Sequence, residues 1–301
     1  MDPLSRKKRF TYLISFAVLF AVCIPFLILY AIGYQFNSIK GVVTTGGIYV
    51  NTNTSGADVS LNGRFQKTTN IFQHNFLIGN LDPGTYVISV SKPGFMTWSK
   101  KLQVFGEEVT DIYALLLPTK IPTTNIARYL LPDGSPAVAS TSAELRSIKN
   151  KTENPVYTRV AALFATTTNY AALLPVRSGL ATTTNLAVKH KMALWTQGLN
   201  LHVRWLGNID DMPQYFCVDQ KCESELVFPV GSKISHVDLF PISDRFVLLT
   251  LPQGVFIYEI DAFSVGSSGM PLVLGKGVDF RIGLDGDIYT KVGLAYYSLT
   301  I

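Results

Sequence analysis

Three residues of this sequence, His236, Asp238 and Asp279, are the best placed for acid–base chemistry. An enzyme that hydrolyses or cleaves a carbohydrate needs carboxylates, or His and Arg, that converge from equivalent strand starts. Only these three lie roughly at such positions along the predicted strands described below. They define one hypothesis, a carbohydrate-acting hydrolase or lyase.

Two acidic pairs have simpler explanations than catalysis or calcium binding. Asp210-Asp211 lies in a polar loop, where solvation suffices, and Asp285-Gly286 fits a hairpin turn that favours Asp-Gly. A calcium site at Asp210-Asp211, or at Asp285 with Asp287, is the alternative, because calcium takes carboxylate oxygens. The chain has no HExxH motif, GxSxG elbow or P-loop, so the sequence predicts no cofactor and no metal.

Cys217 and Cys222 enclose the residues VDQK in the stretch QYFCVDQKCESELVF. Two apolar runs joined by a short polar turn predict a hairpin, and facing positions across a hairpin lie within disulfide reach. The sequence therefore predicts a Cys217–Cys222 disulfide, which requires a compartment outside the cytoplasm. Two free thiols or half of a metal site are the alternatives, but no second Cys/His pair has zinc-like spacing. Cys23, the third cysteine, lies in an apolar segment.

That apolar segment predicts one transmembrane helix over residues 11–33. Its sequence LISFAVLFAVCIPFLILYAIG, residues 13–33, carries no charge, and about 20 apolar residues suffice to cross a bilayer as a helix. A cleavable signal peptide is the alternative, since Ala31-Ile32-Gly33 resembles a small-x-small cleavage site. The lipid bilayer is thus an expected partner of residues 11–33.

The formal charge of +5 is concentrated at the N-terminal tip, residues 1–10, where Arg6–Arg9 outnumber a single Asp. Basic residues before an apolar segment tend to stay cytoplasmic, which predicts a single-pass protein of the cell membrane with its later domains outside. Because the rest of the chain carries little net charge, we expect no nucleic-acid partner. Only 16% of residues are charged, which suits an all-β extracytoplasmic protein.

After a tether over residues 34–45, short β-type runs end in tight turns. In LDPGTYVISVSKPGF, residues 81–95, Pro83 presets φ for a turn and Gly84 is expected to supply a positive φ. Gly94 is expected to do the same one strand later. None of the runs shows a 3.6-residue apolar period, so residues 46–117 are predicted to form a small β-sandwich.

The order of TSGADVSLNG and LDPGTYVISVSKPGF resembles the PEGA domain, a small extracytoplasmic β-sandwich of bacterial envelope proteins. Thr54 and Ser55 stand where the family has Pro and Glu, which weakens the turn signature but not the strand pattern. The residues that carry the resemblance are Gly56, Ala57, Val59, Leu61, Gly63, Leu81, Pro83, Gly84, Tyr86, Val90, Lys92, Gly94 and Phe95.

Tyr86 and Phe95 are expected to fill the small core of this sandwich, because aromatic side chains in strands are commonly buried. The alternative is that Tyr86, Phe95 and Trp98 form a surface on which a ligand stacks.

A linker over residues 118–128 leads to a region, residues 129–301, in which strands recur at roughly 40-residue spacing. The clearest unit, ISHVDLFPISDRFVLLTLPQGVFIYEID at 234–261, divides into three strands and two turns. This region resembles a β-propeller of the WD40-like or lipoprotein-associated kind. A closed ring and an open stack of β-meanders both remain possible.

The predicted fold class is all-β, with a single N-terminal transmembrane helix, a PEGA-like sandwich and a propeller-like or β-meander domain. The leading hypothesis is a non-enzymatic, membrane-anchored binding or scaffolding protein of the cell envelope, with an envelope protein or polysaccharide as partner. A sensor ectodomain, which would signal through a partner, is a further alternative. The residues expected at the interface are Arg204, Trp205 and Tyr215.

Overall fold

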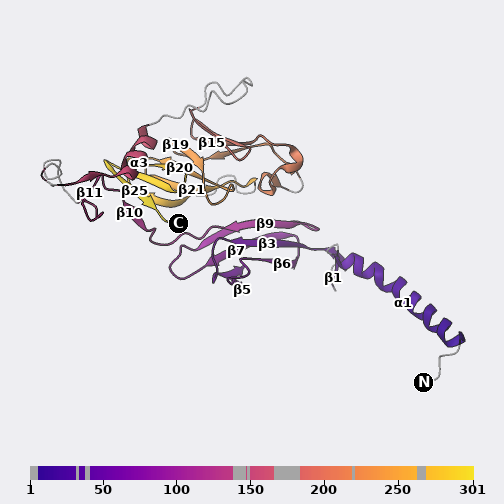
Figure 1. Ribbon diagram of the computed structural model, residues 1–301. Helices are drawn as coiled ribbons and strands as arrows, with labels where there is room; N and C mark the ends of the chain where they lie inside the picture. The colour runs from indigo at the N-terminus through magenta and orange to yellow at the C-terminus, as the bar shows by residue number, and fades with distance from the viewer. Residues whose placement is uncertain are drawn as a thin grey trace. The chain divides into compact units, whose positions relative to one another are not determined.

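The computed structural model describes residues 6–31, 34–37, 41–137, 147, 150–165, 184–218, 221–262 and 269–301. The chain divides into two compact units, unit 1 (residues 1–116) and unit 2 (residues 117–301) (Figure 1). Strands account for 49% of the structure and helices for 18%, so the chain is mostly β, as predicted.

Unit 1 begins with helix α1 (Arg6–Ala31), which contains Pro25. The stretch Lys7–Ala31 is long and apolar enough to cross a membrane, and an 18-residue window within it has a mean hydropathy of 2.7, although a signal sequence passes the same test. The residues from Lys7 to Ala31 are exposed on every side of the helix. Residues 1–5 of the predicted N-terminal tip and residues 32–33 of the predicted transmembrane segment lie outside the described residues.

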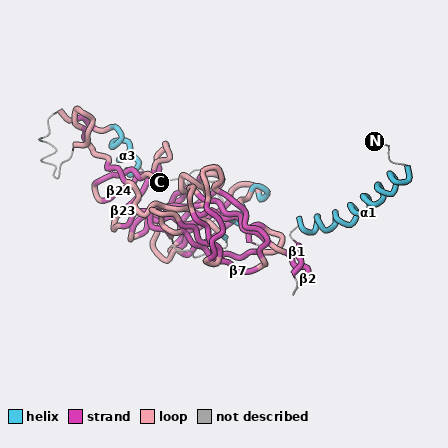
Figure 2. Tube along the Cα trace, turned by 90° about the horizontal axis from the view of Figure 1, so that it is seen from below, coloured by secondary structure: helices cyan, strands magenta, loops and turns pink. Residues whose placement is uncertain are grey.

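A short hairpin occupies most of the predicted tether. Strand β1 (Tyr34–Asn37) pairs with strand β2 (Gly41–Thr44) in antiparallel register, directly after the helix (Figure 2). This hairpin was not predicted from the sequence, which indicated only a tether here.

The rest of unit 1 is a sandwich of two sheets, in the strand orders β6-β3-β9 and β5-β4-β7-β8. Strands β3 and β9 run parallel, and every other pair is antiparallel. Alternate side chains point inward; on β8, Trp98, Leu102 and Val104 are buried between exposed neighbours. The strands are β3 (Gly46–Thr52), β4 (Asp58–Leu61), β5 (Arg64–Thr68), β6 (Asn75–Leu81), β7 (Gly84–Ser91), β8 (Trp98–Val104) and β9 (Val109–Ala114).

The turns of the sandwich confirm one predicted backbone conformation and correct another. Gly94 has a φ of +84°, as predicted. Gly84 has no positive φ, so that prediction was wrong: the residue already belongs to β7 and pairs with Val104. A positive φ is needed instead at Asn62 (49°) and Gly63 (76°), which form the two-residue turn between β4 and β5.

Trp98 and Phe76, with 6% and 8% of their surfaces exposed, are buried aromatic residues of the sandwich, whereas Tyr86 and Phe95 are not buried. Tyr86 is half-buried, and its hydroxyl donates to the backbone oxygen of Asp82 (2.9 Å). Phe95 is also half-buried, with the Lys92 ammonium 4.7 Å from its ring centre. Tyr86 and Phe95 therefore lie at the edge of the sandwich core, where the Asp82 carbonyl and the Lys92 ammonium are their polar neighbours.

Unit 2 contains three four-stranded antiparallel sheets, in the orders β13-β14-β15-β18, β19-β20-β21-β22 and β23-β24-β25-β10. Each of the first two sheets is made from consecutive segments of chain. The third sheet takes its fourth strand, β10, from the beginning of the unit and from within the predicted linker. In the part of the chain that the structure describes, these sheets do not close into a propeller.

The strands of these sheets are β10 (Thr123–Asn125), β13 (Thr184–Lys189), β14 (Met192–Gln197), β15 (Asn200–Trp205), β18 (Glu225–Pro229), β19 (His236–Leu239), β20 (Phe246–Leu251), β21 (Gly254–Glu259), β22 (Met270–Leu274), β23 (Val278–Ile282), β24 (Ile288–Val292) and β25 (Ala295–Leu299). Shorter elements are β11 (Tyr129–Leu130), β12 (Thr152–Glu153), β16 (Cys217–Val218), β17 (Lys221–Cys222) and the 3-10 helices η2 (Ile209–Asp211) and η3 (Gln214–Phe216).

Helix α3 (Pro155–Ala165) was not predicted. Asn154 caps it, with Oδ1 accepting from the Val156 amide (3.0 Å), and Pro155 takes the first helical position. Its buried Val160 packs against Tyr289 and Tyr296 of the third sheet. A larger core lies between the first two sheets and includes Met192, Leu194, Val203, Phe216, Leu226, Val237, Val247, Leu249 and Ile260.

Candidate functional site

The first strands of the three sheets, β13, β19 and β23, lie next to one another and bring polar side chains together. We call these residues the first-strand cluster: Lys189, His236, Asp238, Thr250, Asp279 and Arg281. His236, Asp238 and Asp279 were named from the sequence, and the structure places all three in the cluster. The other three members were not predicted.

Lys189 and Asp238 join the first sheet to the second. The Lys189 Nζ lies 2.8 Å from each carboxylate oxygen of Asp238, which is only 15% exposed. Asp238 Oδ1 also accepts from the Leu239 amide (2.8 Å). The carboxylate is thus held from two directions, so its position is fixed.

Asp279 joins the second sheet to the third. Its Oδ1 accepts from the Thr250 hydroxyl (2.8 Å) of β20 and from the Phe280 amide (2.9 Å). Its Oδ2 accepts from the Arg281 guanidinium (2.7 Å). Arg281 in turn lies 5.2 Å from the ring of Phe164 on α3, so the helix supports this end of the cluster.

His236 lies among these charges with its ring 4.8 Å from that of Phe280. Burial, and then the positive charge of Arg281, lower the pKa of His236 to about 4, although Asp279 and Asp238 act in the opposite direction. The imidazole is therefore neutral at pH 7, with one nitrogen that donates and one that accepts.

The cluster is rich in donors and acceptors but carries no net charge. Two cations balance two carboxylates, and the imidazole is neutral. The side chains of Lys189 and Asp279 are 35% and 31% exposed, so the cluster can be reached from water. Such a surface matches a neutral ligand with many hydroxyl groups better than an ion, because an ion would need an uncompensated opposite charge.

The cluster is poorly arranged for hydrolysis. A glycosidase needs one carboxyl group that donates a proton, yet Asp238 and Asp279 both accept hydrogen bonds from cations. Among the described residues, no three His, Cys, Asp or Glu side chains gather as a metal site would require.

The sandwich of unit 1 places the predicted motif residues at its turns and in its core. Gly56 has a φ of +69°, and Ala57 and Val90 are fully buried. Residues 45–120 match the family model of the PEGA domain. The PEGA domain therefore spans β3 to β9, and the resemblance seen in the sequence is confirmed for this part of the chain. No curated protein matches the chain.

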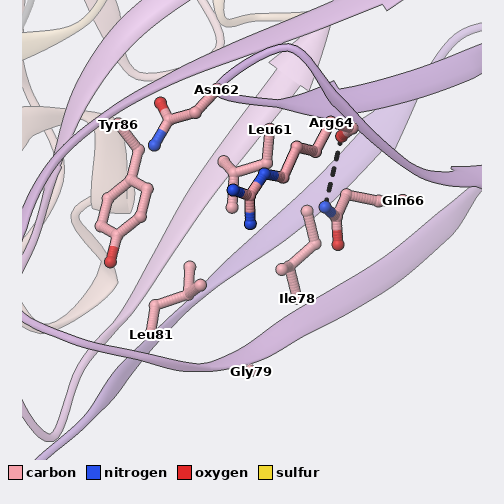
Figure 3. A pocket seen from close by; sticks show the side chains of 8 residues that line it. All are labelled: Leu61, Asn62, Arg64, Gln66, Ile78, Gly79, Leu81 and Tyr86. Atoms are coloured by element: carbon pink, nitrogen blue, oxygen red, sulfur yellow. Dashed lines mark hydrogen bonds between the residues drawn. The ribbon is translucent and has the colours of Figure 1, made fainter.

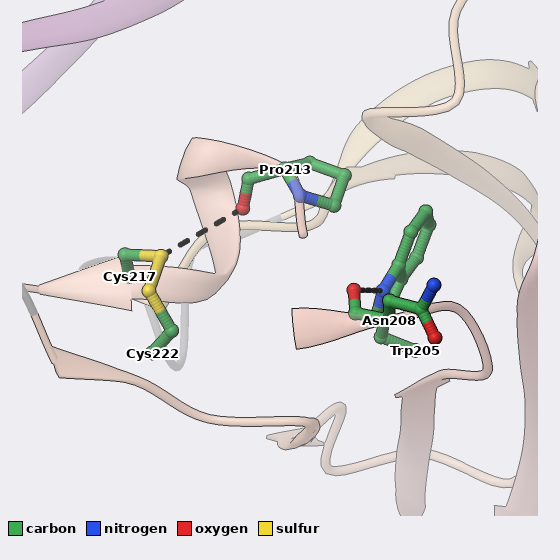
Figure 4. The surroundings of a disulfide bond; sticks show 5 residues. All are labelled: Trp205, Asn208, Pro213, Cys217 and Cys222. Carbon is green, nitrogen blue, oxygen red and sulfur yellow. Dashed lines mark hydrogen bonds between the residues drawn. A yellow bond between two sulfur atoms is a disulfide. The ribbon is translucent and has the colours of Figure 1, made fainter. Parts of the chain in front are cut away.

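Beyond the PEGA domain, the predicted disulfide is present. Cys217 and Cys222 face each other across β16 and β17 and are bonded (Figure 4). Cys23 is free, in α1. The bond fastens a short hairpin that follows η3, and in Figure 4 the Cys217 sulfur faces the backbone oxygen of Pro213.

Arg204, one of the three predicted interface residues, lies in a local ion pair. Its Nε donates to Glu225 Oε2 (3.0 Å), and His202 lies 3.1 Å from the other oxygen. Burial alone would raise the pKa of Glu225, but the hydrogen bonds from Arg204 and His202 lower it. Arg204 also lies 5.3 Å from the ring of Trp195, so its charge is already satisfied.

Trp205 and Tyr215, the other two, pack against the core of unit 2. The Trp205 indole donates to the backbone oxygen of Asn208 (2.8 Å), as Figure 4 shows. The Tyr215 ring lies 5.3 Å from that of Phe216, and burial is the main cause that raises the pKa of Tyr215 to about 12. Both side chains are half-buried and have structural partners. An interface role for these residues remains a prediction.

The two acidic pairs considered for calcium also have structural partners. Asp211 lies 3.3 Å from Lys191, and Asp285 accepts from the hydroxyl of Tyr289 (3.0 Å). Gly286, with a φ of +84°, completes the hairpin turn that Asp285-Gly286 predicted.

Proposed function

We propose that this protein is a membrane-anchored, extracytoplasmic binding protein of the cell envelope. Helix α1 serves as a retained anchor with the N-terminus in the cytoplasm. The PEGA domain acts as a stalk, and unit 2 binds a neutral envelope polysaccharide through the first-strand cluster. The protein is a binding module rather than an enzyme.

The observation that carries this proposal is the first-strand cluster. Fixed donors and acceptors from four strands of three sheets, partly exposed and without net charge, are suited to recognising sugar hydroxyls. Both carboxylates are ordered by their cationic partners before any ligand arrives, which reduces the entropy lost on binding.

Three features support the extracytoplasmic location. Helix α1 has the length and composition of a membrane span. A PEGA domain occupies residues 45–120, and this family consists of small extracytoplasmic β-sandwiches of bacterial envelope proteins. The Cys217–Cys222 disulfide suits an oxidising compartment.

We further propose that the three sheets of unit 2 are blades of a propeller-like domain. The first two sheets run through their strands in chain order, and the first strands of the three sheets lie together, as at the centre of a propeller. The pairing of β10 with β25 joins the start of the unit to its end, which is how a ring of blades would be fastened.

Polysaccharide binding can be tested with the full-length protein in detergent micelles. The assay measures its affinity for purified cell-wall polysaccharide, with Asp279→Asn as the test variant and Asp244→Asn as the control. Asp244 is 47% exposed, pairs with His190 and lies outside the cluster. Because a hydrogen bond to a charged group contributes about 1.5–3 kcal/mol, we expect Asp279→Asn to weaken binding at least about tenfold.

Equal affinities for the wild type and Asp279→Asn would refute the cluster as the site. Binding of an envelope protein instead of polysaccharide would refute the ligand class. Release of oligosaccharides by the wild type but not by Asp279→Asn would favour the hydrolase hypothesis.

The location is tested by counting the thiols that react with an alkylating reagent added while the protein is denatured during lysis, without and with a reductant. One thiol before reduction and all three cysteines after it would support an extracytoplasmic unit 2. Three thiols without reduction would contradict it.

A further inference from the structure

The PEGA domain has four edge strands, and β6 differs from the other three. Natural sheets protect their edges with charged residues or proline. Strand β5 carries Arg64 and Lys67, β8 carries the exposed Lys101, and β9 carries Asp111. Strand β6, with the sequence NFLIGNL, has neither a charge nor a proline.

The outer edge of β6 presents unpaired backbone groups. The amide of Thr52 donates to the oxygen of His74 (3.1 Å), and the antiparallel register continues along β3 and β6. Because bonded residues alternate in such a pair, Phe76 and Ile78 bond to β3. Asn75 and Leu77 therefore direct their N–H and C=O groups away from the sheet.

Exposed apolar side chains surround this edge. Leu77 on β6 is 55% exposed, and Phe72, in the turn just before β6, is 93% exposed. Asn70 Oδ1 accepts from the amides of Phe72 (2.9 Å) and Gln73 (2.8 Å), which fixes the turn and holds Ile71 and Phe72 at its tip. Apolar groups that are both fixed and exposed point to a binding surface.

A groove of about 520 Å³ opens beside β6, between the two sheets. Its walls include the apolar side chains of Leu61, Ile78 and Leu81, and Figure 3 shows the Arg64 guanidinium facing into it. The groove residues include no acidic side chain. Arg64 makes no ion pair with any residue that the structure describes.

We propose that β6 and this groove bind an extended segment of a partner protein, which adds to the sheet as a further strand. The added strand would hydrogen-bond to Asn75 and Leu77, place alternate apolar side chains against the groove, and bring an acidic side chain to Arg64. A second copy fits less well, because pairing two β6 edges would bring the Arg64 and Lys67 side chains of both copies together. This inference is independent of polysaccharide binding by unit 2.

The test uses full-length protein in detergent micelles and a pool of synthetic peptides of about eight residues, a typical strand length. Apolar residues alternate in these peptides with acidic, basic or neutral residues. Fluorescence anisotropy measures binding, and hydrogen exchange measures protection of the Asn75 and Leu77 amides. We expect acidic peptides to bind best and to protect these amides, and N-methylated backbones not to bind.

Two variants and a matched control identify the surface. Leu77→Lys places a charge on the edge, and Arg64→Glu reverses the charge of the groove; each is expected to weaken binding of acidic peptides about tenfold or more. Arg64→Glu should also shift the preference toward basic peptides. Val109→Lys, at a 47% exposed position on the opposite edge of the same sheet, should leave binding unchanged.

Four results would overturn the proposal. They are failure of every peptide to bind, binding that survives N-methylation or Leu77→Lys, a wild-type preference for basic peptides, and self-association that Leu77→Lys abolishes. The last result would assign the edge to a second copy of this chain. Because Arg64 is exposed, Arg64→Glu keeps the test valid even if Leu77→Lys does not fold.

Discussion

The half-buried, neutral imidazole of His236 should make the stability of unit 2 depend on pH within a definite window. The pKa of His236 is about 4 in the folded state against 6.5 for an ordinary His. Above pH 6.5 neither state binds the proton, so the group has no effect. Between pH 6.5 and about 4, His236 is protonated in the unfolded chain but not in the folded chain. The free energy of unfolding therefore falls as the pH falls.

The size of the loss follows from the two pKa values. Each unit of separation corresponds to about 1.4 kcal/mol, so the full window amounts to about 3 kcal/mol. Replacement by Gln removes the titrating group while keeping a side chain that donates and accepts. The part of the pH-dependent loss that His236 causes should then disappear.

The assay is urea unfolding of the full-length protein in detergent micelles, followed by tryptophan fluorescence. Trp98→Phe serves as the background, because the remaining Trp195 and Trp205 both lie in unit 2. Unfolding free energies at about pH 7.5 and pH 4.5 are compared with and without His236→Gln. The His236 protein should lose about 2–3 kcal/mol more than the Gln variant.

A difference below about 1 kcal/mol would refute the argument that burial and Arg281 keep His236 neutral. A general loss of stability in the Gln variant, caused by the missing contact with Phe280, does not affect the test. Each protein is compared only with itself at the two pH values.

Three further predictions concern covalent and backbone features. Replacing Cys217 and Cys222 together by Ser should lower the free energy of unfolding of unit 2 by about 2 kcal/mol in non-reducing urea titrations, because it frees a short loop; an unchanged midpoint would contradict this. Gly63→Ala forces a side chain into a φ of +76° and should cost about 1 kcal/mol, whereas Gly84→Ala, in extended backbone, should cost less; equal losses would contradict the turn assignment. Asn154→Ala removes the cap of α3 and should cost about 1 kcal/mol in thermal unfolding of unit 2, and an unaltered Tm would show that the cap is unimportant.

Local patterns in the sequence predicted most strands of both units. Runs such as RFVLLTL and GVFIYEID are apolar, short and bounded by turn residues, so their conformation depends little on distant contacts. Strand β10 could not be found this way, because TTN becomes a strand only by pairing with Tyr297, Ser298 and Leu299 at the other end of the unit.

The sequence around helix α3 contains a local pattern typical of a helix, but this region was interpreted as strands. Asn154-Pro155 is a cap followed by a favoured first helical residue, and Val156, Val160 and Phe164 follow at helical spacing. The same bias placed a positive φ at Gly84, where the strand had already begun.

The candidate site was predicted in part. His236, Asp238 and Asp279 stood out because strand starts can be located in sequence. Lys189 and Thr250 did not, because each reaches its carboxylate from a neighbouring sheet, and sheet packing leaves no mark in the spacing of residues.

The pairing of β10 with β25 also constrains when unit 2 can finish folding. Strand β10 is made first and has no partner until β25 follows, after most of the unit has been synthesised. Because synthesis proceeds from the N-terminal end, the Cys217–Cys222 hairpin can form early, whereas the third sheet must wait for the last strands. A chain interrupted before β25 would leave β24, which carries the buried Ile288 and Tyr289, as an unpaired edge. An incomplete chain would therefore be an aggregation-prone intermediate, whereas β25 covers this edge in the finished domain.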